Sequence, residues 1–326
     1  MKISLLNILA TTALIATLIS CSPTDNDIQF SNKGKEVPEF SSDMAYTYIE
    51  EQVAFGPRVP NSEAHRNAIA YFREHFSSTA GSDAVFVQEF ETEVYGDTLQ
   101  LFNLVAAFGL EHSDRIVLAA HWDSRPRAEE DPDNPGEPID GADDGGSGVG
   151  VLMELATIFA EHGVPVGVDI ILFDGEDYGE SGDLSNYFLG SRHWSQNPPV
   201  PGYSPRFGIL LDMVGGTGAV FPKEGYSMNY APDLVNQIWM VADEMGYGDL
   251  FPDELGGAVS DDHMIVERYT GIPMINIIHH RRGAGGRVQF APYWHTQNDT
   301  MDIIDKEVLQ AVGEVLLEMI YNRIPG

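Results

Sequence analysis

The sequence predicts an α/β fold with a mostly parallel, mixed central sheet and helices on both faces. Short, continuously apolar runs have the length of buried strands, and segments with helical periodicity separate them. Strands that are apolar on both sides need helices over both faces of their sheet, as in parallel sheets. The strands are expected at 115–120 (RIVLAA), 168–173 (VDIILF), 207–213 (FGILLDM) and 273–278 (PMINII).

Helices are predicted around these strands. The segment 62–76 (SEAHRNAIAYFREHF) has apolar residues at helical spacing, and Ser62 or Asn61 is its expected N-cap. The same spacing predicts helices at 148–162, 231–245 and 305–323. Because no repeat or low-complexity block interrupts the sequence, residues 41–326 are expected to form a single domain.

The charge balance limits the partners. The 326 residues include 50 Asp and Glu against 18 Lys and Arg, which gives a formal net charge of -32. A protein of this charge repels phosphate backbones and anionic lipid. We therefore expect no nucleic-acid partner, contact with a membrane only through an anchor, and a monomer.

The N-terminus has the pattern of an export signal. Lys2 precedes an apolar run that is short for a membrane span, and small residues follow. The ending LISC resembles the lipobox of bacterial lipoproteins, which implies a signal peptide at 1–20 and a lipidated Cys21. Cys21 is the single cysteine, so intrachain disulfides are excluded. Residues 21–40 are expected to be a flexible tether, and Ser22 favours the outer membrane of a Gram-negative envelope, reached through the periplasm.

Polar side chains follow each predicted strand. His121 comes after the first strand, the acidic run LFDGEDYGE continues the second, Asp212 ends the third, and His295 lies beyond the fourth. Carboxyl ends of parallel strands meet at one edge, where such sheets bind ligands. The glycine-rich loop 140–148 (DGADDGGSG) allows further carboxylates to approach the same point. Imidazole with carboxylate is a ligand set typical of catalytic zinc. The alternative is a set of polar loops without metal.

Several motifs in the same order resemble the zinc aminopeptidase family, which also contains the animal-type glutaminyl cyclases. They are His121 with Asp123, GADDGGSG (141–148), GED (175–177), LLDM (210–213), SDDH (260–263) and WHTQNDT (294–300). The resemblance runs from about residue 46 to the C-terminal helix and implies a phosphorylase/hydrolase-like fold.

The resemblance also implies roles for individual residues. Asp144, Asp177 and His295 are the expected ligands of one zinc ion, although many family members have glutamate in place of Asp177. His121 and Asp212 would hold a second ion, as in two-zinc peptidases. Glu176, the first acid of the pair, is the expected general acid/base, because it stays unligated beside the metal.

Three features favour the glutaminyl cyclases over the aminopeptidases. Trp294 directly precedes His295, Asp261 adds an acid before Asp262, and NYFLGSRHW (186–194) resembles a cyclase segment. The implied activity is a zinc-dependent glutaminyl-peptide cyclotransferase, an acyltransferase that converts N-terminal glutamine of peptides or proteins to pyroglutamate and releases ammonia. Asp212 and Asp261 would act on the leaving ammonia. The alternatives are a two-zinc aminopeptidase and a catalytically silent binding lipoprotein.

The substrate pocket is less defined by the sequence. Trp294, Phe290 and Tyr293 are its candidate walls, because the cyclases' pocket tryptophan after the acidic pair is missing here. Asp174 and Glu180 receive no role and are expected to be solvated or capping residues. The basic loop 279–287 (HHRRGAGGR) is expected to be a solvated loop, or else a guide for acidic peptides.

Overall fold

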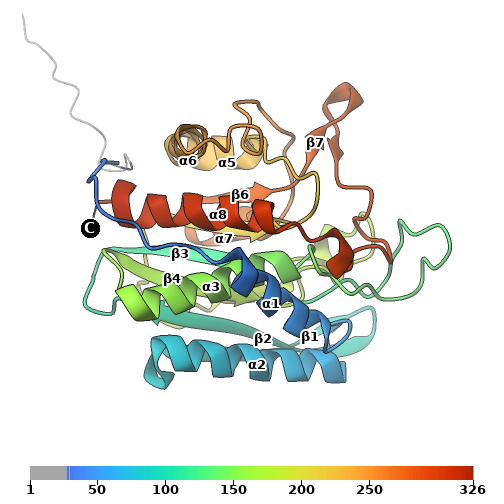
Figure 1. The fold of residues 1–326 in the computed structure, drawn as a ribbon. Coiled ribbons are helices and arrows are strands. Elements are labelled where there is room, and N and C mark those ends of the chain that lie inside the picture. Colours follow the sequence, from blue (N-terminus) through green and yellow to red (C-terminus); the bar gives the residue numbers. More distant parts are fainter. Residues whose placement is uncertain (1–27, 29, 326) are drawn as a thin grey trace, which may run out of the picture.

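A mixed sheet forms the centre of the structure, a computed structural model that describes residue 28 and residues 30–325 (Figure 1). Its strand order is β1-β2-β4-β3-β5-β6. The bounds are β1 Val85–Val94, β2 Asp97–Phe108, β3 Arg115–His121, β4 Gly167–Phe173, β5 Gly208–Asp212 and β6 Met274–Ile278. Strands β4, β3, β5 and β6 run parallel, and β2 joins β4 antiparallel. The predicted fold class is confirmed, and the predicted signal peptide and Cys21 lie outside the described residues.

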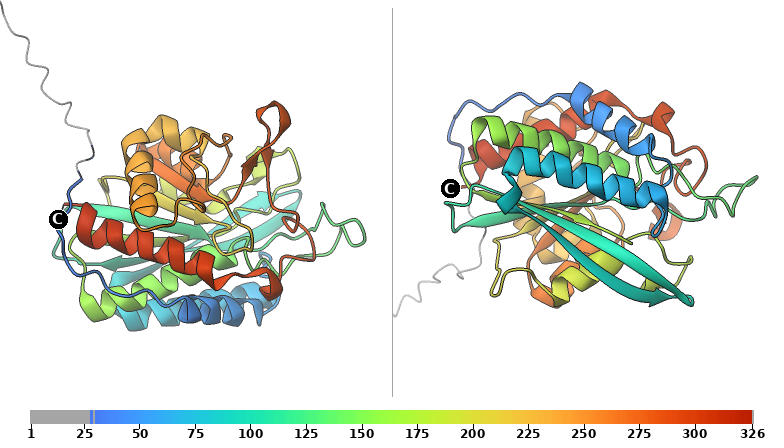
Figure 2. Two further views of the ribbon diagram at one scale, coloured as in Figure 1. Left: turned by 45° about the horizontal axis from the view of Figure 1, so that its top comes forward. Right: turned by 90° about the horizontal axis from the view of Figure 1, so that it is seen from below.

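Helices cover both faces of the sheet, and the right-hand view of Figure 2 separates the two layers. In β3, Leu118 and Ala120 face the larger core, whereas Val117 and Ala119 face the smaller one. The larger core is shared with α1 (Ser42–Val53), α2 (Glu63–Ala80), α3 (Gly146–His162), α6 (Pro232–Glu244) and α8 (Lys306–Glu318). The smaller core is covered by α4 (Leu189–Gln196) and α7 (Asp262–Thr270). A short helix, α5 (Gly225–Tyr230), lies against β6.

The long β1–β2 hairpin was not among the predicted elements. It begins the sheet, and its two strands pair from Val85 with Ala106 to Val94 with Asp97. Tyr95 and Gly96 form the turn with φ of 54° and 93°, a conformation that suits a two-residue hairpin connection. Polar and apolar residues alternate irregularly along β1, which is half exposed, so its periodicity is a weak signal.

The glycine-rich loop before α3 brings that helix close to the sheet. A Cβ on Gly148 would lie 2.5 Å from the carbonyl oxygen of Leu211 in β5, so only glycine permits this approach. Gly145, just before the helix, has a φ of 86°. The loop therefore lies directly beside the strand ends, as its glycine content predicts.

The predicted tether is shorter than expected. Ser31 and Lys33 donate backbone hydrogen bonds to the carbonyls of Arg323 and Asn322 (2.7 and 3.1 Å), and Phe40 is buried against α8. Residues 31–40 thus belong to the folded unit, because their backbone finds partners in the C-terminal segment. The predicted helix at 305–323 is α8 followed by a π-helical turn, Met319–Arg323. In the described part of the chain no helix is long and apolar enough to cross a membrane.

Candidate metal centre and active site

The residues predicted from the strand ends lie together. His121 ends β3, Glu176 and Asp177 follow β4, and Asp212 ends β5. The loops before α3 and α8 add Asp144 and His295. All six side chains are buried or nearly so. The predicted convergence at the carboxyl edge of the parallel strands is what the structure shows.

Asp144, Asp177 and His295 form a group whose ligand atoms can hold one metal ion. The Nε2 atom of His295 is 3.4 Å from Asp177 Oδ1 and 3.6 Å from Asp144 Oδ2. Two ligands bound tetrahedrally at zinc distances are about 3.3 Å apart, so the spacing is close to that around an ion. Asp177 Oδ2 and His295 Nδ1 are buried without hydrogen-bond partners. The donor set and the unsatisfied Asp177 oxygen both fit zinc.

His121, Asp144 and Asp212 form a second group that shares Asp144 with the first. Here the imidazole is already engaged. Its Nε2 is hydrogen bonded to Asp212 Oδ1 at 3.3 Å and lies 3.1 Å from Asp144 Oδ1. Burial lowers the pKa of His121, but Asp123, Asp144 and Asp212 together raise it well above its ordinary value. The three carboxylates thus favour a positive charge at this point, either on the imidazole or on a bound cation.

Arg125, which sequence reasoning missed, holds the metal-site acid Asp177. Its Nη1 donates to Asp177 Oδ1 at 2.9 Å and to the Asp177 carbonyl at 2.7 Å, and its other side pairs with Glu129. Burial raises the pKa of Asp177, but His295 and Arg125 outweigh it, so that this pKa is lowered. Asp177 is therefore ready to bind a cation. The residues around Asp177 in the sequence do not predict this contact, because Arg125 is 52 residues away.

The Glu176 carboxylate has a different environment from that of its neighbour Asp177. Its carboxylate lines the cavity and accepts no hydrogen bond within the described residues. Burial raises the pKa of Glu176 well above its ordinary value, with opposition from His121 and reinforcement from Asp177. An unligated carboxyl with a raised pKa has the properties of a general acid/base.

A cavity of about 210 Å³ opens beside these groups. Trp294 is stacked on His295 with ring centroids 3.6 Å apart and an interplanar angle of 21°, and Phe290 packs on Trp294 at 4.6 Å. Sequence reasoning missed another wall of the cavity, which the loop after the acidic pair supplies. That wall is formed by Ser181, Gly182, Leu184, Tyr187 and Phe188.

Tyr293 does not line this cavity, which corrects its predicted role as a pocket wall. Its hydroxyl donates to Asp143 Oδ2 at 2.9 Å, and its ring is buried. Adjacent residues in the turn 291–296 point to different sides, so the sequence could not separate Trp294 from Tyr293. Tyr293 supports the loop that carries Asp144.

Asp261 lines the cavity at the start of α7. Its Oδ1 accepts the Asp262 backbone N–H, and its Oδ2 accepts Asn276 Nδ2–H at 2.6 Å. Burial, and then the charge of Asp212, raise the pKa of Asp261 to about 7. Asp212 lines the same cavity. Both predicted acids therefore face the space where a substrate would lie.

Asp174 was expected to be solvated or capping, and the structure corrects this. It is fully buried, and its Oδ2 lies 2.8 Å from His65 Nε2 and accepts the Phe102 backbone N–H at 2.7 Å. The His65 ring in turn stacks on Trp122. Asp174 thus joins α2 to the sheet below the site, whereas Glu180 is exposed as expected.

Backbone strain is concentrated at the site. Three residues that form or border the cavity have left-handed φ without being glycine: Phe188 (59°), Met213 (50°) and His295 (53°). Such conformations cost roughly 1–3 kcal/mol each and gather at functional sites. At these three positions the strained backbone orients side chains toward the cavity.

The family model described as "Peptidase family M28" matches residues 103–320, which include every candidate ligand. The chain belongs to peptidase family M28. This confirms the predicted resemblance to zinc aminopeptidases.

Solved structures resemble this M28 chain over nearly their whole length. A glutaminyl cyclase of Tannerella forsythia is 48% identical with a TM-score of 0.82, covering 87% of this chain and 99% of that one. A Zn-dependent exopeptidase of Parabacteroides distasonis is 44% identical with a TM-score of 0.83, covering 88% and 100%. Aminopeptidase YwaD of Bacillus subtilis (strain 168) is 26% identical over 66% of this chain, but the match spans only 42% of YwaD. The likeness therefore includes both cyclases and exopeptidases.

Two further carboxylates fix the loops of this M28 site, and sequence reasoning gave neither a role. Asp123 accepts the backbone N–H groups of Glu176 and Asp177 at 3.0 and 3.2 Å. Asp299 accepts those of Asp143 and Asp144 at 2.8 and 3.1 Å. Asp299 stands in the motif WHTQNDT, which is the signal that could have found it. Each acid holds one side of the metal-ligand group in place.

Replacing Asp299 by alanine is expected to lower zinc affinity by roughly 10–100-fold, because loss of a group that orients a ligand has this effect. The two N–H groups before and at Asp144 would lose their acceptor. Zinc affinity is measured by chelator competition, with melting temperature as a check on folding. Asp302→Ala, an exposed acid three residues on, is the matched control. Unchanged affinity in a folded Asp299→Ala protein would contradict this role.

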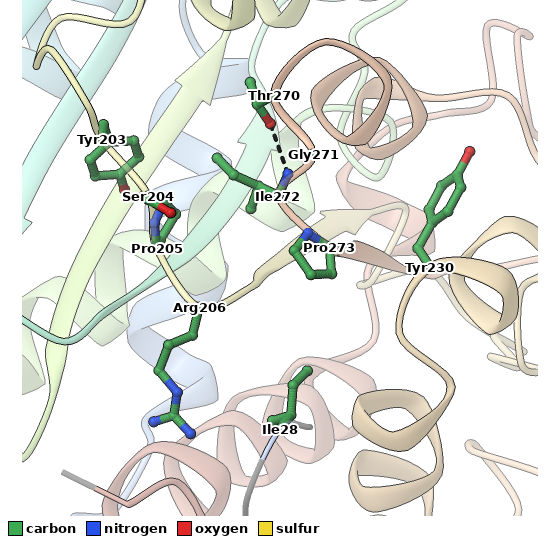
Figure 3. A pocket seen from close by; sticks show the side chains of 10 residues that line it. All are labelled: Ile28, Tyr203, Ser204, Pro205, Arg206, Tyr230, Thr270, Gly271, Ile272 and Pro273. Atoms are coloured by element: carbon green, nitrogen blue, oxygen red, sulfur yellow. Dashed lines mark hydrogen bonds between the residues drawn. The ribbon is translucent and has the colours of Figure 1, made fainter. Parts of the chain in front are cut away.

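A larger pocket of about 480 Å³ lies at the other end of the strands (Figure 3). It is lined by residues that precede β5 and β6, including Tyr203, Arg206 and Pro273, and by Ile28. Neither of the metal-ligand groups found in the described residues lies there. Size alone therefore does not identify the active site of this M28 protein.

Proposed function

We propose that this protein is a zinc-dependent glutaminyl-peptide cyclotransferase. The observation that carries the proposal is the Trp294 indole lying flat on His295, with Phe290 behind it. An apolar wall against a metal ligand limits water at the reacting atoms and favours folding of a glutamine side chain back on its own amine. The 48% identity with a glutaminyl cyclase supports the same activity.

In this proposal one zinc ion would be held by Asp144, Asp177 and His295. Zinc at this position would act as a Lewis acid toward the γ-carbonyl of the substrate. One ion is sufficient for this reaction, because the nucleophile is the substrate's own amine and no metal-bound water is needed. Arg125 Nη1 donates to Asp177 Oδ1 at 2.9 Å, and Glu129 Oε1 lies 3.6 Å from His295 Nδ1.

Proton transfer is assigned to Glu176. It accepts a proton from the substrate's α-amine as the amine nitrogen forms a bond to the γ-carbonyl carbon. It returns the proton to the amide nitrogen as the carbon–nitrogen bond breaks, so ammonia leaves and a pyroglutamyl ring remains. Asp212 and Asp261, which both line the cavity, accept hydrogen bonds from the departing ammonia.

The test is incubation of the zinc-loaded protein with a glutaminyl peptide and with a leucyl peptide of the same length. Mass spectrometry should show loss of ammonia from the first and no release of leucine from the second. A chelator should stop the reaction, and added zinc should restore it. If no glutaminyl peptide lost ammonia, the cyclase proposal would be wrong.

The second candidate is a two-zinc aminopeptidase. The ligand group of His121, Asp144 and Asp212 favours it, and so does the likeness to a Zn-dependent exopeptidase. Release of leucine in the same experiment, with two zinc ions per chain, would establish this alternative. A chain that binds zinc but turns over neither peptide would instead be the silent binding lipoprotein.

We further propose that the chain is exported and lipidated on Cys21, in a bacterial envelope. The LISC motif supports this, and Ile28 lies beside residues that precede β5 and β6, at the edge opposite the active site. A tether there would leave the cavity facing away from the lipid. Cys21→Ser is expected to move the protein from the membrane fraction to the soluble fraction, measured by fractionation of cells. Retention of the variant in the membrane fraction would contradict lipid anchoring at this residue.

A further inference from the structure

A small arginine-rich hairpin stands out from the body beside the active site (Figure 1). Its strands are β7 (Arg281–Arg282) and β8 (Val288–Gln289), which pair antiparallel. The side chains of Arg281, Arg282 and Arg287 are exposed. Three arginines within seven residues form a concentrated positive patch, since the whole chain has only 18 Lys and Arg.

Both ends of the hairpin are joined directly to the cavity. Ile278 and Phe290 line the cavity, and each is three residues from the nearest arginine of the hairpin. Three extended residues span at most about 10–11 Å. The backbones of Arg281 and Arg287 are therefore at most about 10–11 Å from those of Ile278 and Phe290, which is the length of about three residues of an extended bound peptide.

The base of the hairpin is fixed. The Nε2 atom of His280 accepts the Gly257 backbone N–H at 3.2 Å, and its Nδ1 lies 3.0 Å from the Ile278 carbonyl. His280 is fully buried. The hairpin that carries the arginines is therefore anchored at the rim of the cavity.

Within the described residues no carboxylate pairs with these three arginines. Arg281 donates to the Gly218 carbonyl at 3.1 Å. By contrast, Arg115 and Arg323 pair with carboxylates at 2.7 and 2.8 Å. The hairpin therefore keeps its positive charge at the surface of an acidic protein.

We propose that the hairpin is a subsite for acidic side chains in the substrate peptide, at the positions just after the N-terminal glutamine. This inference rests on the proposed cyclase function. The cavity acids Glu176, Asp212 and Asp261 suit the substrate's amino group, whereas the hairpin suits carboxylates a few residues along. A peptide with a free N-terminus and acidic second and third residues matches both charges.

The test compares a glutaminyl peptide that has glutamate at its second and third positions with one that has glutamine there. The acidic peptide is expected to have a kcat/KM about tenfold higher at low salt, mainly through KM, as several exposed charge pairs would provide. High salt should remove the difference. R281A/R282A/R287A should lose the preference and keep kcat, and the triple lysine variant should retain it.

A matched control removes three exposed arginines elsewhere, Arg66 and Arg73 on α2 and Arg268 on α7. This variant has the same change in net charge and should keep the preference for the acidic peptide. Loss of the preference in the control would show that overall charge, not the hairpin, attracts the peptide, and would overturn the proposal.

Binding without turnover gives an independent readout. In Glu176→Gln protein, calorimetry should show tighter binding of the acidic peptide, again dependent on the hairpin arginines. Equal kcat/KM for the two peptides, with normal ammonia release, would overturn the subsite and leave the cyclase standing. Absence of ammonia release from either peptide would instead overturn the cyclase. If the hairpin variant lost only binding to anionic lipid vesicles, the surface would be a lipid site and the peptide subsite would be wrong.

Discussion

Glu176→Gln protein is expected to lose ammonia release from glutaminyl peptides while it keeps its zinc. The glutamine has nearly the same shape, and the backbone N–H at this position stays bonded to Asp123. What disappears is the carboxylate that moves the proton, and such a loss lowers the rate by roughly 10²–10⁴-fold. The measurements are kcat with one glutaminyl peptide and the zinc content of the purified protein.

Asp177→Asn is the matched comparison for Glu176→Gln. Both changes turn one acid of the same pair into its amide, but Asp177 belongs to the ligand group and Glu176 does not. The Asp177 variant should lose zinc as well as activity. If Glu176→Gln released zinc and Asp177→Asn did not, the two roles would be reversed.

Much of the sheet and the centre of the site could be predicted because they depend on local pattern. An apolar run that ends abruptly in a polar residue marks both a buried strand and its functional end, as at His121 and Asp212. The density of glycine before α3 likewise indicates close approach, and Gly148 meets the Leu211 carbonyl. In these cases the physical requirement lies within a few consecutive residues.

The groups that hold the centre in place could not be predicted in the same way. Arg125 reaches Asp177 from 52 residues away, and Asp299 reaches Asp143 from 156 residues away. In a chain with 50 acidic residues, nothing local separates a buried carboxylate from a solvated one. Asp174 was misjudged for this reason, because its partner His65 lies in α2, 109 residues away along the chain.

The different outcomes for Trp294, which lines the cavity as predicted, and Tyr293, which does not, have another cause. Neighbouring residues in a turn do not follow the alternation of a strand, so their directions depend on the backbone of that turn. His295 has a φ of 53°, which reorients the chain just after Trp294. The sequence predicted Trp294, Phe290 and Tyr293 as walls, but it could not show that the Tyr293 ring lies away from the cavity.

Replacing Asp144 by alanine is expected to remove both bound metal and activity, because this carboxylate belongs to both ligand groups. The loss should exceed the roughly 10–100-fold effect of residues that only orient ligands. Zinc content and kcat/KM are the measurements, and melting temperature shows whether the protein folds. A folded Asp144→Ala protein with full zinc would contradict the assignment of both groups.

His121→Ala then distinguishes one ion from two. His121 belongs only to the second group, where its Nε2 is bonded to Asp212 at 3.3 Å. If a single ion lies on Asp144, Asp177 and His295, the variant should keep one zinc per chain. Its activity should fall only in part, because Asp144 and Asp212 lose the imidazole between them but the zinc ligands remain. If two ions bind, wild-type protein should contain two and His121→Ala one. Two ions per wild-type chain would support the aminopeptidase alternative, and one ion would support the proposed cyclase.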